Sequence, residues 1–174
     1  GDPGDTVKVV VNNIHFAAPV NLTPASITST KVQVTIPNDP NNYPAGAYTA
    51  AIGFDKGAGI YRMTGELPFI LSPEKPTLPA GPLVRAGDGN LTVAANVNPK
   101  VWQGQRVSLM LGDQEAIALP FVGSKTNTLQ FIFRAIPPNP AYLYRIRVDG
   151  ADNEFIDRTK TPPEFFPGQS IAVV

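Results

Sequence analysis

The stretch Tyr142-Leu143-Tyr144-Arg145-Ile146-Arg147-Val148, followed directly by Asp149-Gly150, decides the fold class. Its large apolar side chains stand at every second position, and side chains two apart lie on the same face of a β-strand. Asp-Gly is a strong hairpin signal because glycine tolerates the positive φ that tight hairpin turns need. The stretch therefore predicts a half-buried strand that ends in a hairpin turn.

Six further runs alternate apolar and other residues in the same way. They are Thr6–Val11, Lys31–Ile36, Tyr48–Phe54, Leu91–Val97, Val107–Leu111 and Leu129–Phe133. No long segment shows the 3.6-residue period of an amphipathic helix. The chain also holds 19 prolines and 15 glycines, so turns are frequent. Many short strands between turns predict an all-β protein of the β-sandwich type.

The strands occur twice in the same order. The matching segments are Gly4–Asn12 with Gly104–Gly112, Val32–Ile36 with Leu129–Phe133, and Tyr48 after Pro44 with Tyr144 after Pro140. A unit of about 100 residues has the size of an immunoglobulin-like sandwich. We therefore expect two tandem immunoglobulin-like β-sandwiches, over residues 1–72 and 83–174. Residues 73–82 are rich in proline and predict a semi-rigid linker, because proline fixes φ and lacks an amide donor.

The first copy lacks the start of this pattern. The second copy has a strand, Leu91–Val97, before its Gly104 turn, whereas the first copy begins at its Gly4 turn. We therefore expect the first sandwich to lack its initial strand, and the chain to be a fragment or a processed form of a longer protein. Leu67–Phe69 contains a proline and is expected to be an edge strand, since proline cannot serve a central ladder.

The composition excludes several function classes. Fourteen basic residues balance fourteen acidic ones, so the net charge is zero, and we expect neither a nucleic-acid nor a membrane partner, which need a basic excess. Cysteine is absent, and His15 is the one histidine. There is no Ser/His/acid set, nucleophile elbow or phosphate loop. We therefore expect no enzyme activity, no metal and no cofactor.

The motifs resemble known domains. Gly1–Val7 and Pro44–Tyr48 resemble an IPT/TIG-type immunoglobulin-like domain. A larger set looks like the C-terminal tandem immunoglobulin-like region of a bacterial family of unknown function, whose members are similar to the tail-terminator, or cap, proteins of phage-tail-like contractile injection systems. That set comprises Glu66–Pro73, Gly104–Asp113, Tyr144–Asp152 and Ile156–Arg158, in this order.

The resemblance implies a non-catalytic structural or protein-interaction module, appended to a cap-like protein. In that family an N-terminal α/β domain does the capping, and it is absent from this sequence. The implied partners are proteins of a large particle, such as a tail sheath, tube or cap assembly, and the implied location is the bacterial cytoplasm or the assembled particle. The alternative function is a carbohydrate- or cell-surface-binding immunoglobulin-like module, because fold alone does not fix function.

Two groups of residues are candidates for an interaction surface. Aromatic residues that the alternation does not explain are Trp102, Phe121, Phe165 and Phe166. An exposed tryptophan can stack on a sugar or anchor an interface, but in a small sandwich it more often closes the end of the core, which we favour here. The polar loop residues Asp39, Asn41, Asn42 and Tyr43 form either a turn or a recognition loop.

Three further features have structural interpretations. The acids of Asp149–Glu154 could bind calcium, although a hairpin turn is favoured because the loop lacks the ligand spacing of an EF-hand. His15 is expected to be half-buried at the end of a strand. Tyr142 or Tyr144 could supply the hydroxyl bond of a tyrosine corner.

Overall fold

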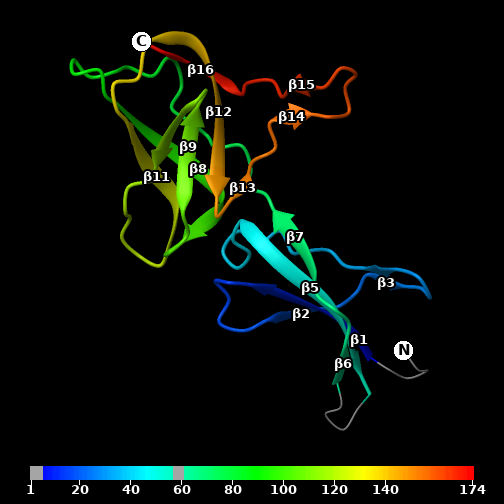
Figure 1. The fold of residues 1–174 in the computed structure, drawn as a ribbon. Coiled ribbons are helices and arrows are strands. Elements are labelled where there is room, and N and C mark those ends of the chain that lie inside the picture. The colour runs from blue at the N-terminus through cyan, green and yellow to red at the C-terminus, as the bar shows by residue number, and fades with distance from the viewer. Residues whose placement is uncertain (1–5, 57–60) are drawn as a thin grey trace. The chain divides into compact units, whose positions relative to one another are not determined.

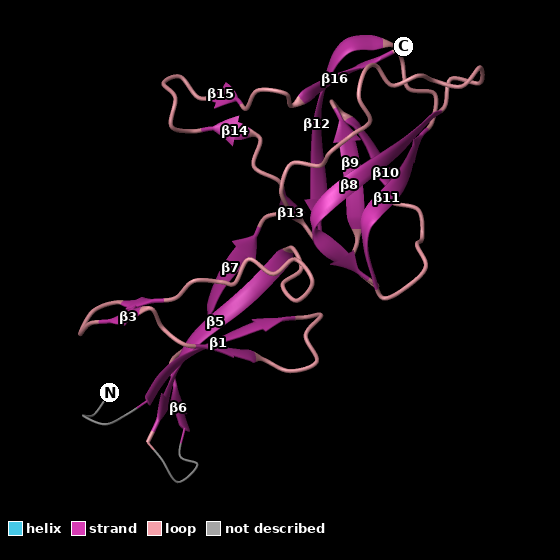
Figure 2. Cartoon of the chain, turned by 180° about the vertical axis from the view of Figure 1, so that it is seen from behind, coloured by secondary structure: helices cyan, strands magenta, loops and turns pink. Residues whose placement is uncertain are grey.

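A computed structural model describes residues 6–56 and 61–174, and these ranges contain strands and loops without a helix (Figures 1 and 2). The turn expected at Gly4 lies outside the described residues. The strands are β1 (Thr6–Asn13), β2 (Val20–Leu22), β3 (Ser26–Ile27), β4 (Val32–Gln33), β5 (Gly46–Asp55), β6 (Tyr61–Met63), β7 (Leu67–Leu71), β8 (Leu91–Trp102), β9 (Val107–Leu111), β10 (Gln114–Ile117), β11 (Lys125–Phe133), β12 (Asn139–Val148), β13 (Ala151–Asp152), β14 (Ile156–Asp157), β15 (Glu164–Phe165) and β16 (Ser170–Val173). The all-β prediction is confirmed, and the antiparallel sheets fit a β-sandwich. The tandem immunoglobulin-like arrangement stays a prediction.

The chain divides into two compact units that are not contiguous in sequence. Unit 1 takes the chain up to Asn38 and again over Ala47–Leu71. Unit 2 comprises Asp39–Gly46 and Ser72–Val174. The short segment 39–46 therefore belongs to the second unit although the chain on either side of it belongs to the first.

Unit 1 is built on one five-stranded sheet in the order β2-β1-β5-β6, with β7 also paired to β5 (Figure 1). Because β7 pairs with β5 alone, the edge position expected for Leu67–Phe69 is confirmed. The strand expected over Lys31–Ile36 is wrong in extent, since only Val32–Gln33 pairs, with Ser26–Ile27. Alternating apolar and polar side chains suit a half-buried strand, but a strand also needs a neighbouring strand whose backbone forms hydrogen bonds with its own.

Aromatic side chains cover part of the unit 1 sheet. The Tyr48 ring lies 5.1 Å from Phe69 in a stacked arrangement and 5.7 Å from Phe16 edge to face. Tyr48 is buried, as are Val9 and Val11 on the neighbouring strand β1. His15 lies half-buried just beyond the end of β1, where its backbone N–H donates to Asn13 Oδ1, so that prediction is confirmed.

Unit 2 has two sheets that bury their apolar faces in one core. One sheet has the order β10-β9-β12-β13 with β16 also on β12, and the other pairs β11 with β8. Alternate residues of β8, β11 and β12 are buried, and all five residues of β9 are buried. Leu109, Phe131 and Ile146 are each fully buried. The proline-rich stretch expected to be a linker lies in unit 2, where Thr77 pairs with Asn96 of β8.

The turn chemistry of unit 2 follows its sequence. Asp149 and Gly150 both have positive φ, 46° and 85°, and connect β12 to β13 as the expected hairpin. The Tyr142 hydroxyl donates to the Pro137 carbonyl oxygen over 3.1 Å, which confirms a tyrosine-corner bond at the start of β12.

Candidate functional site

The segment Asp39–Tyr43 is a tight turn organised by Asp39. One carboxylate oxygen accepts from Asn41 N–H over 3.0 Å, and the other accepts from the Asn42 side-chain amide over 2.7 Å. The hydrogen bond from the Asn42 side chain, followed by that from the Asn41 backbone, lowers the pKa of Asp39, because both stabilise its charged form. The backbone N–H groups of Asn42 and Tyr43 both donate to the Asp39 carbonyl. Asp39 therefore stabilises this turn by accepting hydrogen bonds from Asn41, Asn42 and Tyr43.

Lys125 joins this turn to Trp102. The Lys125 ammonium donates to the Asn41 carbonyl oxygen and lies 3.8 Å from the centre of the Trp102 ring. A cation at this distance over an indole face is a favourable cation–π contact. The half-buried Trp102 ring therefore has one face covered by this chain's own lysine, which limits that face as a stacking platform.

Gln105 is the centre of the same network. Its side-chain N–H groups donate to the Ala45 carbonyl and to Asp149 Oδ2, both over 2.8 Å. Its side-chain oxygen accepts from the backbone N–H of Trp102 over 2.9 Å. One amide thus holds the 39–46 segment, the end of β8 and the β12–β13 turn together.

The carboxylates considered for calcium face protein donors instead. Asp149 Oδ1 accepts from the backbone N–H of Arg106 over 2.8 Å. The Asp152 carboxylate accepts two hydrogen bonds from the Arg147 guanidinium, at 2.8 and 3.0 Å. The hydrogen bond with Asp152 raises the pKa of Arg147. In the described ranges no group of three or more acidic, histidine or cysteine side chains has a metal-binding arrangement. The geometry is that of a braced hairpin.

The remaining candidate aromatics occupy different environments. Phe121 is half-buried and packs against the main core. Phe166 is half-buried, and its backbone N–H donates to the Phe155 carbonyl over 3.1 Å. Phe165, on the short strand β15, is 52% exposed. The structure thus gathers Asp39, Asn41 and Trp102 around Lys125, and Phe165 and Phe166 around Phe155.

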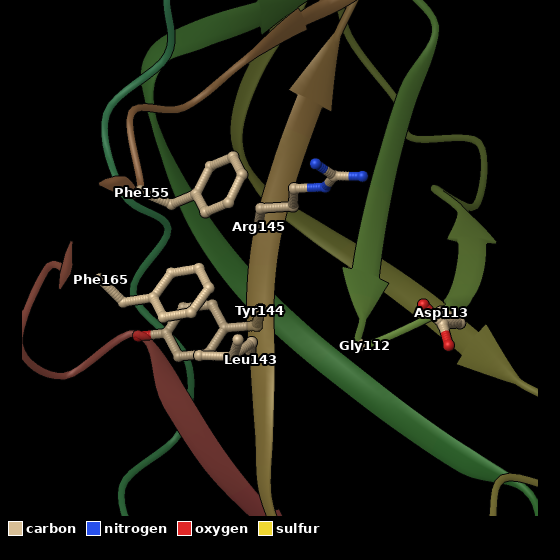
Figure 3. A pocket seen from close by; sticks show the side chains of 7 residues that line it. All are labelled: Gly112, Asp113, Leu143, Tyr144, Arg145, Phe155 and Phe165. Atoms are coloured by element: carbon tan, nitrogen blue, oxygen red, sulfur yellow. The ribbon is translucent and has the colours of Figure 1, made fainter. Parts of the chain in front are cut away.

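A surface pocket of about 210 Å³ lies between β12 and the antiparallel β14–β15 pair (Figure 3). It is lined by Gly112, Asp113, Leu143, Tyr144, Arg145, Phe155 and Phe165. The Phe155 and Phe165 rings stack nearly parallel, with centres 6.1 Å apart and planes 16° apart. Figure 3 shows both rings beside β12, with Phe165 next to Tyr144. The pocket is therefore an open hollow with three aromatic side chains in its lining.

Two polar side chains that line the pocket, Tyr144 and Arg145, already interact with other groups of unit 2. The Tyr144 hydroxyl donates to the Gly168 carbonyl over 2.9 Å, and burial raises the pKa of this phenol. The Arg145 guanidinium lies 5.3 Å from the Phe155 ring centre and 3.7 Å from Asp152. Both side chains are thus held in place before any ligand arrives.

Sequence reasoning selected Phe165 but passed over Phe155 and Arg145. Arg145 lies within the alternating stretch Tyr142–Val148, and Phe155 directly follows the acidic segment Asp149–Glu154. The missing information is spatial, because the stack depends on a two-residue strand pair, Ile156–Asp157 with Glu164–Phe165, which is too short to show a period.

The comparisons with known proteins give one family. The family model described as Domain of unknown function (DUF8756) matches residues 72–174. No curated protein and no solved structure matches the chain. Within the described residues, no helix has the length and apolar character required to cross a membrane.

Proposed function

The chain belongs to this family of unknown function, and from that premise we propose that it is a non-catalytic protein-interaction module whose contact site is the Phe155–Phe165 pocket. The observation that carries the proposal is the exposure of Phe165 while it stacks on Phe155 beside Arg145. Anchored aromatic and arginine side chains are the residue types enriched at protein-interface hot spots.

The pocket is prepared for a partner's apolar side chain. Stacking restrains Phe165, and hydrogen bonds restrain Tyr144, so little side-chain freedom is left to lose on binding. Asp152 is already the counter-ion of Arg145. The planar guanidinium of Arg145 can therefore offer its flat face, at the edge of the pocket, to a partner side chain. We infer that the partner inserts an apolar or aromatic side chain between these residues.

We propose further that this module is the appendage of a cap-like protein of a phage-tail-like contractile injection system. Its support is the resemblance carried by Gly104–Asp113 and Tyr144–Asp152. These two stretches provide four of the residues that line the pocket, Gly112, Asp113, Tyr144 and Arg145. The resemblance and the pocket therefore coincide at the turn between β9 and β10 and on β12.

The test is to tag the full-length protein and image the particles with which it co-purifies. We expect sheath-and-tube particles labelled at one end, and a monodisperse soluble protein would overturn the cap-like assignment. Phe165→Ala is expected to lower particle labelling roughly tenfold or more without changing the melting temperature. Val122→Ala, at a fully exposed apolar residue of unit 2, is the control and should keep the label.

A second candidate, carbohydrate binding, has one observation in its favour. The exposed Phe165 ring is flat and accessible in an open hollow, and a sugar face can stack on such a ring. We expect no glycan-array signal, because Trp102, the better stacking residue, has a face covered by Lys125. Specific glycan binding that Phe165→Ala abolishes in a folded protein would replace the protein-interaction proposal.

A further inference from the structure

One aspartate of unit 2 differs from the other aspartates that the structure describes. The others accept hydrogen bonds or form an ion pair within the chain, and they are Asp39, Asp55, Asp88, Asp149, Asp152 and Asp157. Asp113 is exposed, and within residues 6–56 and 61–174 its carboxylate takes part in no hydrogen bond or ion pair. The fold of the described residues therefore does not use this side chain.

Asp113 lies in a two-residue hairpin turn between β9 and β10, where Leu111 pairs with Gln114. Gly112 supplies a positive φ of 55°, as the first residue of such a turn requires. The Gly112 N–H also donates to the Leu143 carbonyl of β12 over 2.7 Å, which holds the turn against that strand. The turn thus presents Asp113 at the pocket from a fixed backbone.

The Asp113 carboxylate and the Phe165 ring line the same pocket from two directions. Figure 3 shows Phe165 on one side of β12 and Asp113 on the other side of that strand. The pocket volume of about 210 Å³ is below the roughly 300–1,000 Å³ of small-molecule sites, so the pocket suits one inserted side chain. Such a side chain meets an aromatic face at one end and a carboxylate at the other.

Filling the pocket displaces water from Asp113. A carboxylate that loses water without gaining a hydrogen-bond donor weakens binding, because its desolvation is not compensated. A purely apolar side chain could pack on Phe165, but it would leave the Asp113 carboxylate in this state. The inserted side chain therefore requires a donor at the end that meets Asp113.

The charges around the pocket favour a neutral donor. The Asp152 carboxylate accepts two hydrogen bonds from Arg147, at 2.8 and 3.0 Å, and also lies 3.7 Å from Arg145. Two guanidinium groups thus share one carboxylate, and the negative charge of Asp113 compensates the remaining positive charge. A lysine or arginine from a partner would place a like charge near Arg145, whereas a hydroxyl group leaves these charges compensated.

We propose that the anchoring side chain of the partner is a tyrosine, whose ring packs on Phe165 and whose hydroxyl donates to the Asp113 carboxylate. This inference rests on the proposed function and adds the identity of the residue that fills the pocket. Tyrosine combines a flat ring with a phenolic O–H donor. A site built for this hydrogen bond discriminates against phenylalanine, because the Asp113 carboxylate would then stay unpaired.

The test titrates the full chain with two blocked amino acids that differ by one hydroxyl, N-acetyltyrosinamide and N-acetylphenylalaninamide. Amide NMR shifts of Gly112, Asp113 and Leu143 report binding. The tyrosine compound is expected to bind about fivefold or more tightly, because it adds a hydrogen bond to a charged acceptor. N-acetylargininamide should bind no more tightly than the phenylalanine compound, since its charge meets Arg145.

Substitutions at the turn locate the origin of this preference. Asp113→Ala should equalise the affinities of the tyrosine and phenylalanine compounds without changing the melting temperature, because the residue is exposed. Asp113→Asn keeps an acceptor oxygen without the charge and should retain part of the preference. Glu115→Ala, at an exposed acid of β10 that does not line the pocket, is the matched control and should retain all of it.

The inference and the proposed function fail in different ways. Equal affinities for the unsubstituted chain, both lost in Phe165→Ala, would overturn the tyrosine assignment and leave the pocket as an interaction site for apolar side chains. Amides that do not shift with either compound at millimolar concentration would contradict the site and the tyrosine together. Tightest binding of the arginine compound would assign Asp113 to a cationic partner side chain instead.

Discussion

In unit 2 the central strands β9 and β12 bury their apolar faces in one core with a second sheet. In unit 1 the equivalent strands β1 and β5 carry buried side chains such as Val11 and Tyr48 beside half-buried ones such as Ile52, and the Phe16 and Phe69 rings pack on Tyr48. The strand order is nevertheless the same. The difference teaches that local pattern and backbone pairing suffice to specify the sheet, while a dry core requires a second layer.

A matched pair of core truncations tests most directly whether the side chains of the two units differ in burial. Ile146→Ala should lower the free energy of unfolding of unit 2 by about 2–5 kcal/mol, because the side chain is fully buried. Ile52→Ala, at a half-buried isoleucine of the equivalent strand β5, should cost unit 1 less than half as much. Urea unfolding, followed by the fluorescence of the one tryptophan for unit 2 and by β5 amide exchange for unit 1, measures both. Equal losses would show that unit 1 is already fully covered.

Removing the Gln105 side chain tests whether it holds residues 39–46 in unit 2. Gln105→Ala should destabilise the tryptophan-monitored transition by about 1–3 kcal/mol, because three part-buried hydrogen bonds are lost. Gln130→Ala, at an exposed position of β11, is the control and should be nearly neutral. If amide exchange within residues 39–46 did not rise in Gln105→Ala, the segment would not depend on this side chain.

The tyrosine corner gives a smaller effect confined to one unit. Tyr142→Phe removes only the hydroxyl that donates to Pro137, so unit 2 should lose about 1 kcal/mol of unfolding free energy. The Ile52 region of unit 1 should show unchanged exchange. A change of similar size in both units would contradict their treatment as separate compact bodies.

The smallest expected effect concerns the exposed turn at Asp39. Because the pKa of Asp39 is lowered in the folded chain, its contribution to stability is present above the ordinary value of 3.8 and is lost as the pH falls through the lower folded-state pKa. Asn42→Ala removes the largest cause and should move this pKa back toward 3.8. Carbon-13 NMR titration of the Asp39 carboxyl measures the shift, and an unchanged pKa would assign the shift to the backbone bonds instead.

The sequence predicted the elements whose chemistry is local. Alternation predicted β1, β5, β8, β9, β11 and β12, Asp149-Gly150 predicted the hairpin, and Tyr142 was one of two tyrosines considered for the corner bond. Each of these depends on period-two burial or on a turn residue's own conformational preference. Such signals lie within a few residues of the structure they specify.

What the sequence did not predict depends on contacts between distant residues. The Asn41–Lys125 and Ala45–Gln105 bonds join polar groups 84 and 60 positions apart, with no periodic pattern on either side. The Phe155–Phe165 stack likewise spans a loop held by a two-residue strand pair. Of the candidate site, the sequence supplied Phe165 as a single residue, and the pocket around it required the fold.

Because residues 39–46 belong to unit 2, the compact unit and the region matched by the family model do not have the same boundaries. Ala45, 2% exposed, is part of the main core of unit 2, and its carbonyl accepts from Gln105. The family model begins at residue 72 and therefore omits Ala45. A gene fragment cut at that boundary would encode β8 to β16 and still leave out a piece of the core that these strands enclose, so the matched family region and the compact unit have different boundaries.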